Sequence, residues 1–286
     1  MEPLGVDGML VFFRGYIDES YDPEYENVFT LSCLLSTGRI WVDLSRAWKL
    51  MLDSWNRRLK KQGRPKISRY HAVYCSNLRG EFQGWSLDEQ KELFSDILKI
   101  FKKYQVDTVA LSVNLRDMDT YFPEARKYAK PDFRTFLYGM TTGFLIGRIA
   151  DRFCTKYPNP RIALVHDRNA YDAVMLDGFN QQMSDPAFEH KACFTTFAPM
   201  GWEHCIPLQP ADLVAYENFK DALRKINPRE RRISLKMLID LDAFSGRAQS
   251  MDQPAIIRLR EEMMATALSL PAPHLVTPPT ALGGTS

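Results

Sequence analysis

Hydrophobic and polar positions along the chain follow two different periods, which predict strands and helices in turn. Segment 9–17 is rich in aliphatic and aromatic residues, and a polar stretch separates it from a second apolar run over 28–35, so we expect a β-hairpin. Apolar residues over 40–60 recur at steps of three and four, which predicts a helix with a wide apolar stripe. The same reasoning predicts strands over 66–74, 106–113, 161–166 and 193–198, and helices over 87–104, 132–156, 171–183, 209–225, 233–240 and 253–268. Helices and strands alternate after the hairpin, which indicates an α/β fold with a central mixed β-sheet flanked by helices and extra helices at the C-terminal end.

Composition is typical of a folded domain of enzyme size. The chain has 286 residues, 45% of them hydrophobic and 25% charged. We expect a single domain over 1–269 and a disordered tail over 270–286, where Pro and Gly are frequent and no apolar period is seen. The most apolar helix, Phe133–Phe153, contains Arg134, Arg148 and Asp151, so we expect it to be buried in protein and predict no membrane span. Five cysteines without a CxxC pair and an N-terminus without a signal-peptide pattern favour a cytoplasmic protein with reduced thiols.

The formal charge of +2 hides an uneven distribution. Segment 56–70 carries seven Lys and Arg residues and no acid, and segment 224–236 carries six against one. Cationic segments on an otherwise acidic chain suggest contact with a polyanion, and the alternative is that both are solvated helix ends and loops. The residues we expect to contact nucleic acid are Arg57, Arg58, Lys60, Lys61, Arg64 and Lys66. Trp41, Trp48 and Trp55 fit the core stripe of their helix, which leaves Trp85 as the candidate platform for stacking a base.

Three acidic residues occupy positions where carboxylates can converge. Asp18 ends the first strand, Asp167 ends the strand over 161–166, and Asp212 lies in the first turn of a late helix. Ligands bind at the carboxyl ends of strands in open α/β sheets, and converging carboxylates repel one another unless cations lie between them. The pattern predicts a site for Mg²⁺ or Mn²⁺, and two such ions can hydrolyse a phosphodiester. N-capping and turn contacts are the structural alternative for each of these acids.

Three motifs resemble those of the bacterial "domain of unknown function 3800" family. They are Tyr16-Ile17-Asp18-Glu19-Ser20, then Tyr70-His71-Ala72 with Glu81-Phe82-Gln83-Gly84-Trp85, and Leu208-Gln209-Pro210-Ala211-Asp212-Leu213-Val214-Ala215-Tyr216. The match spans about residues 8–265. That family is considered a member of the ribonuclease H-like superfamily, whose enzymes hold two divalent ions with acids on the first strand, a middle strand and a late helix. The resemblance therefore implies a ribonuclease H-like sheet, with Asp18, Asp167 and Asp212 as the metal ligands.

The chain departs from the family pattern in three places. Tyr21-Asp22 stands where a Gly is frequent, Pro210 stands where a Leu is usual, and Cys75 stands where one subgroup has an acid, which leaves the fourth ligand open. Glu19 can complete the metal shell if the chain turns there, although a persisting strand would point its side chain to the other face. His71 can ligate Mn²⁺ or hydrogen bond the scissile phosphate, or it can be a structural histidine.

These observations predict a metal-dependent nuclease with Asp18, Asp167, Asp212, Glu19 and His71 as its catalytic residues and a nucleic acid as its partner. The alternative is a catalytically inactive ribonuclease H-like protein that binds nucleic acid or docks a partner in a phage-defence or toxin-like system. A zinc site of His190, Cys193, His204 and Cys205 is disfavoured because their spacing matches no common zinc motif. Gly139, Gly143 and Gly147 share one helix face, which indicates tight packing on the sheet or, as the alternative, a homodimer seam.

Overall fold

The computed structural model describes residues 11–128, 132–240 and 244–269, and it contains one six-stranded mixed sheet. The strands are β1 (Phe12–Tyr21), β2 (Val28–Thr37), β3 (Val106–Asn114), β4 (Arg161–Asp167), β5 (Phe194–Met200) and β6 (Phe244–Met251). Their order across the sheet is β5-β4-β1-β2-β3-β6. β2 is antiparallel to both of its neighbours, whereas β1/β4, β4/β5 and β3/β6 are parallel pairs. The expected α/β fold with a mixed sheet and the opening hairpin are confirmed.

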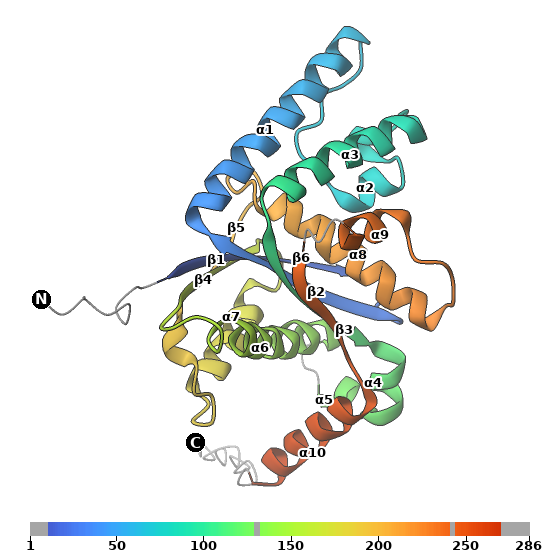
Figure 1. The fold of residues 1–286 in the computed structure, drawn as a ribbon. Helices are drawn as coiled ribbons and strands as arrows, with labels where there is room; N and C mark the ends of the chain where they lie inside the picture. Colours follow the sequence, from blue (N-terminus) through green and yellow to red (C-terminus); the bar gives the residue numbers. More distant parts are fainter. Residues whose placement is uncertain (1–10, 129–131, 241–243, 270–286) are drawn as a thin grey trace, which may run out of the picture.

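Helices cover both faces of this sheet (Figure 1). One face carries α1 (Gly38–Lys61), α3 (Leu87–Lys103) and α8 (Leu208–Ile226), and the other carries α6 (Phe133–Phe153), α7 (Asp172–Ser184) and α10 (Gln253–Ser269). Alternation along β1 divides the core, because Tyr16 packs with the first set of helices while Phe13 and Ile17 pack with the second. The shorter elements are α2 (Ala72–Ser76), α4 (Leu115–Tyr121), α5 (Ala125–Tyr128), α9 (Ile233–Asp240) and the 3₁₀ turns Gly80–Phe82 and Lys191–Cys193.

The tryptophans of α1 form part of the core, as their spacing predicts. Trp41, Trp48 and Trp55 are all buried, and each indole N–H has a hydrogen-bond acceptor. The acceptor of Trp48 is the side-chain oxygen of Gln209 on α8, at 2.9 Å. A buried indole that is both packed and hydrogen bonded fixes α1 against α8, which positions the start of α8.

The strand predicted over 66–74 is wrong. The segment runs without a neighbouring strand into α2, because side chains take up its backbone groups. The side chain of Asn56 bonds both the N–H and the C=O of Ile67, and Glu81 accepts from the N–H of Ser68. These contacts replace a sheet ladder, and they cannot be recognised from apolar periodicity.

Strand β6 was not expected from the sequence, and it extends the sheet beside β3. Its residues, FSGRAQSM, contain a glycine and little alternation of apolar and polar positions, so the local pattern does not indicate a strand. Pairing with the edge of β3 gives this segment its extended form, which is a tertiary effect.

The glycines of α6 pack against another helix. A Cβ at Gly178 of α7 would overlap the carbonyl oxygen of Gly139, and one at Gly139 would lie 3.2 Å from Val174. The prediction that this stripe packs on the sheet is therefore wrong for Gly139 and Gly143, since both face α7. Their face is occupied within the chain, and the homodimer stays a prediction without support from this stripe.

Among the residues that the structure describes, no helix is both long and apolar enough to cross a membrane. The tail predicted over 270–286 lies outside the described residues.

Candidate functional site

Two parallel strands bring Asp18 and Asp167 side by side at one end of the sheet. The register pairs Ile17 of β1 with His166 of β4, so the next residue on each strand is an aspartate. Tyr16 and Val165, two positions earlier, both contact the core cluster on the α8 side, so by alternation both aspartates face α8. His166 points the other way and stacks on Phe197, as its position next to Asp167 predicts.

Helix α8 supplies the third acid from the opposite wall of the same cavity. Asp212 lies one turn into α8, and it lines a cavity of about 430 Å³ together with Asp18 and Asp167. Glu19 and His71 line this space as well. We call it the acidic cavity. The structure thus gathers all five residues proposed from the sequence as catalytic, from β1, β4, α8 and the segment before α2.

The carboxylates of the acidic cavity are crowded and poorly solvated. Burial is the largest cause that raises the pKa of Asp18 well above its usual range, and repulsion from the other carboxylates, first Asp212, adds to the rise. Burial also raises the pKa of Asp167, against the opposing charge of Arg69. Like charges held together in a low-dielectric site favour either protonation or a bound cation. The cluster is therefore electrostatically suited to a divalent ion.

Glu19 reaches the acidic cavity from the other face of β1. The strand continues to Tyr21, so the side chain of Glu19 points toward α6, where it accepts hydrogen bonds from Tyr138 at 3.1 Å and Asn169 at 3.2 Å. Burial, as the largest cause, raises the pKa of Glu19 to about 7, and the charge of Asp167 adds to the rise. The strand does not turn at Glu19, which places its carboxylate among polar partners at the rim of the cluster.

His71 holds the carboxylate of Asp212 in place. Its Nδ1 lies 3.0 Å from Oδ2 of Asp212, and the backbone N–H of Ala72 donates to the same oxygen at 2.7 Å. Gln209, one turn earlier on α8, accepts from the N–H of Tyr70 at 2.9 Å. Two α8 side chains therefore bind three successive residues of the segment before α2.

Arg69 and Trp202 are site residues that the sequence reasoning missed. Both line the acidic cavity, and the guanidinium of Arg69 lies over the indole of Trp202, 4.4 Å from the ring centroid. Arg69 belongs to the basic segment 56–70, so charge alone could have suggested it. Trp202 follows β5 in a turn, and its place beside Arg69 depends on a contact that the sequence pattern does not reveal.

The carboxylates offer oxygen ligands, which suit Mg²⁺ and Mn²⁺. No three of them have oxygens within 4.8 Å of one another: among the described residues, that spacing is met by the side chains of Cys154, His190 and Cys193. A single ion therefore does not explain the cluster without side-chain movement. Of the zinc set weighed from the sequence, His204 is exposed and Cys205 is buried in the core on the α8 side, so neither joins this trio.

The basic residues at the end of α1 fall into two groups. Arg58 pairs with Glu92 at 2.5 Å and Arg64 pairs with Glu89 at 2.7 Å, which neutralises both. The other four are exposed and make no ion pair with the residues that the structure describes: Arg57, Lys60, Lys61 and Lys66.

Trp85 is not a base-stacking platform. It is buried, and its ring stacks on Trp55 with a centroid separation of 5.0 Å. The reason is that the loop before α3 folds back onto α1, which the residue spacing does not show.

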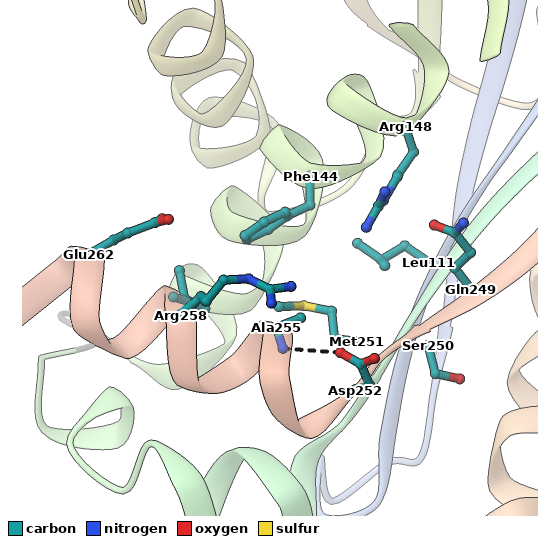
Figure 2. A pocket seen from close by; sticks show the side chains of 11 residues that line it. Leu111, Phe144, Arg148, Gln249, Ser250, Met251, Asp252, Ala255, Arg258 and Glu262 are labelled. Carbon is teal, nitrogen blue, oxygen red and sulfur yellow. Dashed lines mark hydrogen bonds between the residues drawn. The ribbon is translucent and has the colours of Figure 1, made fainter. Parts of the chain in front are cut away.

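A second cavity of about 370 Å³ lies on the other face of the sheet, between α6, β6 and α10 (Figure 2). Arg148 and Arg258 line it, and Asp252 bonds the N–H of Ala255 at 3.0 Å. None of its lining residues lines the acidic cavity, so it is separate from the carboxylate cluster.

Comparison with known proteins does not identify the chain. No model of a known protein family matches it, and a search of curated proteins finds no significant match. The resemblance to the domain of unknown function 3800 family is thus not confirmed by a family match.

Proposed function

We propose that this protein is a ribonuclease H-like nuclease that hydrolyses phosphodiester bonds of nucleic acid with two Mg²⁺ or Mn²⁺ ions. One observation carries the proposal: Asp18, Asp167 and Asp212, from three distant parts of the chain, line the same cavity at the carboxyl ends of two parallel strands. Carboxylates that repel one another at such a crevice are the expected protein contribution to a divalent metal site.

The positions of the acids support the ribonuclease H-like part of the proposal. The resemblance implies one acid on the first strand, one on a middle strand and one on a late helix. Here β1 pairs antiparallel with β2 and parallel with β4, and β5 extends the parallel side. Asp18 on β1 and Asp212 on α8 match, in their order along the chain, the first-strand and late-helix acids that the resemblance implies.

Each residue of the acidic cavity has a distinct proposed role. Asp18, Asp167 and Asp212 bind the ions, and sharing the acids between two ions means that three oxygens need not meet at one point. When bound, such ions activate water and stabilise the leaving oxygen. Glu19, fixed by hydrogen bonds from Tyr138 and Asn169, is a further carboxylate beside the three acids. His71 keeps one oxygen of Asp212 occupied, which orients the other toward the cavity.

Basic and aromatic groups beside the carboxylates fit a nucleic-acid substrate. Arg57, Lys60, Lys61 and Lys66 precede Arg69 in the same basic segment, and Arg57, Lys60 and Lys66 line a separate cavity at the end of α1. Arg69 and Trp202 form a stacked pair at the cavity, which combines a phosphate partner with an aromatic surface.

The decisive experiment compares Asp212→Asn with wild type on mixed DNA and RNA substrates in the presence of Mg²⁺ or Mn²⁺. We expect the wild-type activity to require the ion and to fall about 100-fold or more in the variant, as when a group that stabilises the transition state is removed. Asp177→Asn is the matched control, because Asp177 is exposed on α7 and does not line the acidic cavity.

Two results would contradict the nuclease. One is activity that survives Asp212→Asn, and the other is a wild-type protein that degrades no substrate with either ion. Binding of nucleic acid without cleavage would favour the catalytically inactive alternative.

A further inference from the structure

A second group of metal-ligating side chains lies outside the acidic cavity. Cys154, His190 and Cys193 come from two parts of the chain, and one ligand atom from each lies within 4.8 Å of the other two. All three side chains are partly buried. The group combines two thiols with one imidazole, which is a donor set for zinc and is unlike the oxygen donors of the acidic cavity.

Local structure holds these side chains together. Cys154 caps the C-terminal end of α6, where its N–H donates to the carbonyl of Ala150 at 2.8 Å. His190 precedes the 3₁₀ turn Lys191–Cys193 and Cys193 ends it, and a 2.9 Å hydrogen bond from the N–H of Cys193 to the carbonyl of His190 closes the turn. Residues three apart in such a turn lie on the same side, so both can reach one ion.

The turn is also fixed to the rest of the sheet. The guanidinium of Arg161, at the start of β4, donates to the carbonyl of Ala192 within the turn. β4 and β5 then pair from Ile162 and Phe194 onward. These contacts fix His190 and Cys193 relative to β4. They also fix them relative to Cys154, because the end of α6 leads into β4.

The surroundings favour a borderline-soft cation. Cys154 and Cys193 pack against the core cluster on the α6 side, and the ring of Phe188 stands edge-on to His190 at 6.3 Å. The two sulfur atoms lie within 4.8 Å of each other. Two thiols at this separation, packed against apolar side chains, can bind one cation, which replaces the thiol protons.

We propose that Cys154, His190 and Cys193 bind one Zn²⁺ ion, with solvent at a fourth position, and that this ion ties the C-terminal end of α6 to the start of β5. The site lies at the amino ends of β4 and β5, whereas Asp167 ends β4. Seven residues of strand separate the two ends, a distance of about 20 Å. The ion therefore lies apart from the proposed nuclease site.

The test uses the full-length protein, kept reduced and treated with chelator, and titrates it with Co²⁺ and then Zn²⁺. We expect about one ion per chain, a near-ultraviolet thiolate-to-Co²⁺ absorption band, displacement of Co²⁺ by Zn²⁺, and a rise in Tm of about 5 °C or more at saturating Zn²⁺. Losing a group that only hydrogen bonds a metal ligand typically weakens metal binding by roughly 10–100-fold. Cys193→Ser and His190→Ala each remove a ligand itself, so we expect each to weaken binding by more than this. Each variant keeps at least one cysteine of the site. The Co²⁺ that it still binds should therefore show a thiolate absorption band that differs from that of wild type.

His204→Ala is the matched control, because His204 is an exposed histidine near the trio in sequence that does not belong to it. It should bind the ion like wild type. His190→Ala removes a partly buried side chain and leaves both core cysteines in place, so it tests the site even if Cys193→Ser folds poorly. Wild-type protein that takes up neither ion, equal affinity in His190→Ala and wild type, or recovery of a Cys154–Cys193 disulfide in place of ion binding would overturn the proposal.

Discussion

Asp22 holds the loop of the β1–β2 hairpin through one carboxylate. Its Oδ1 accepts from the N–H groups of Asn27 at 3.0 Å and Val28 at 2.8 Å, and its Oδ2 accepts from that of Glu26 at 2.8 Å. Burial alone would raise the pKa of Asp22, but these backbone donors outweigh it and lower the pKa below its usual value of 3.8. The loop matters for the site because it follows the end of β1, the strand that carries Asp18 and Glu19.

Asp22→Ala should therefore lower the free energy of unfolding by about 1–2 kcal/mol at pH 7, since three backbone donors lose a charged acceptor. Because the pKa is lower in the folded state, the carboxylate stabilises the protein fully above pH 3.8 and loses this effect as the pH falls through the folded pKa. Urea unfolding of wild type and variant at pH 7 and near pH 3 measures the difference. A difference that grows on acidification would contradict this role.

The residues of the acidic cavity differ in how far the sequence could reveal them. Asp18 and Asp167 follow apolar strands directly, so their convergence depends only on parallel pairing, which the order of elements suggests. Arg69 and Trp202 meet through a ring contact between segments far apart in the chain, and no local pattern encodes it. Trp85 was misjudged for the same reason, because its partner Trp55 comes from another helix.

Among the elements, α6 and α7 depend on close backbone approach. A Cβ on Gly178 would overlap the carbonyl oxygen of Gly139, whereas one on Gly147, also in α6, meets nothing within 4 Å. Gly178→Ala should lower the free energy of unfolding by about 1–3 kcal/mol, the usual cost of overpacking. Gly147→Ala should be neutral or stabilising by about 0.5–1 kcal/mol, since Ala favours a helix over Gly.

Thermal and urea unfolding of the two variants measures both effects. They change the same residue type in the same way, so a difference between them reports the α6–α7 contact alone. Equal stability of Gly178→Ala and Gly147→Ala would show that the two helices can separate at little cost.

Elements with strong periodicity were predicted well, and those fixed by tertiary contacts were not. The wide apolar stripe of α1 is a local signal, and it is confirmed. The helix predicted over 87–104 is also present as α3, which begins with a capping box of Ser86 and Glu89. The segment before α2 has its backbone groups bonded by Asn56, Glu81 and Gln209 side chains, so an apolar run there does not become a strand. In β6 the partner strand supplies the extended form.

At the scale of the whole molecule, the proposed nuclease needs a cationic surface in addition to its acidic cavity. Carboxylates alone would repel a polyanion, so binding must come from cations elsewhere on the surface. The exposed residues Arg57, Lys60, Lys61 and Lys66 are suited to this because no ion pair with a described residue neutralises them. Paired arginines such as Arg58 have an acidic partner already.

Reversing two of these charges, Arg57→Glu with Lys61→Glu, should weaken nucleic-acid binding and reduce the slope of log K against log salt by about 2, or about one for each lost phosphate contact. Both side chains are exposed, so the fold should be retained. The control is Arg39→Glu with Arg46→Glu, which makes the same change of charge near the start of α1. Arg39 lies about 27 Å from Arg57 along the helix axis. Binding of nucleic acid by both double variants is measured over a range of salt concentrations. Equal losses of affinity in the two variants would indicate that only the net charge of the protein matters. Unchanged affinity in Arg57→Glu with Lys61→Glu would show that the end of α1 does not contact nucleic acid.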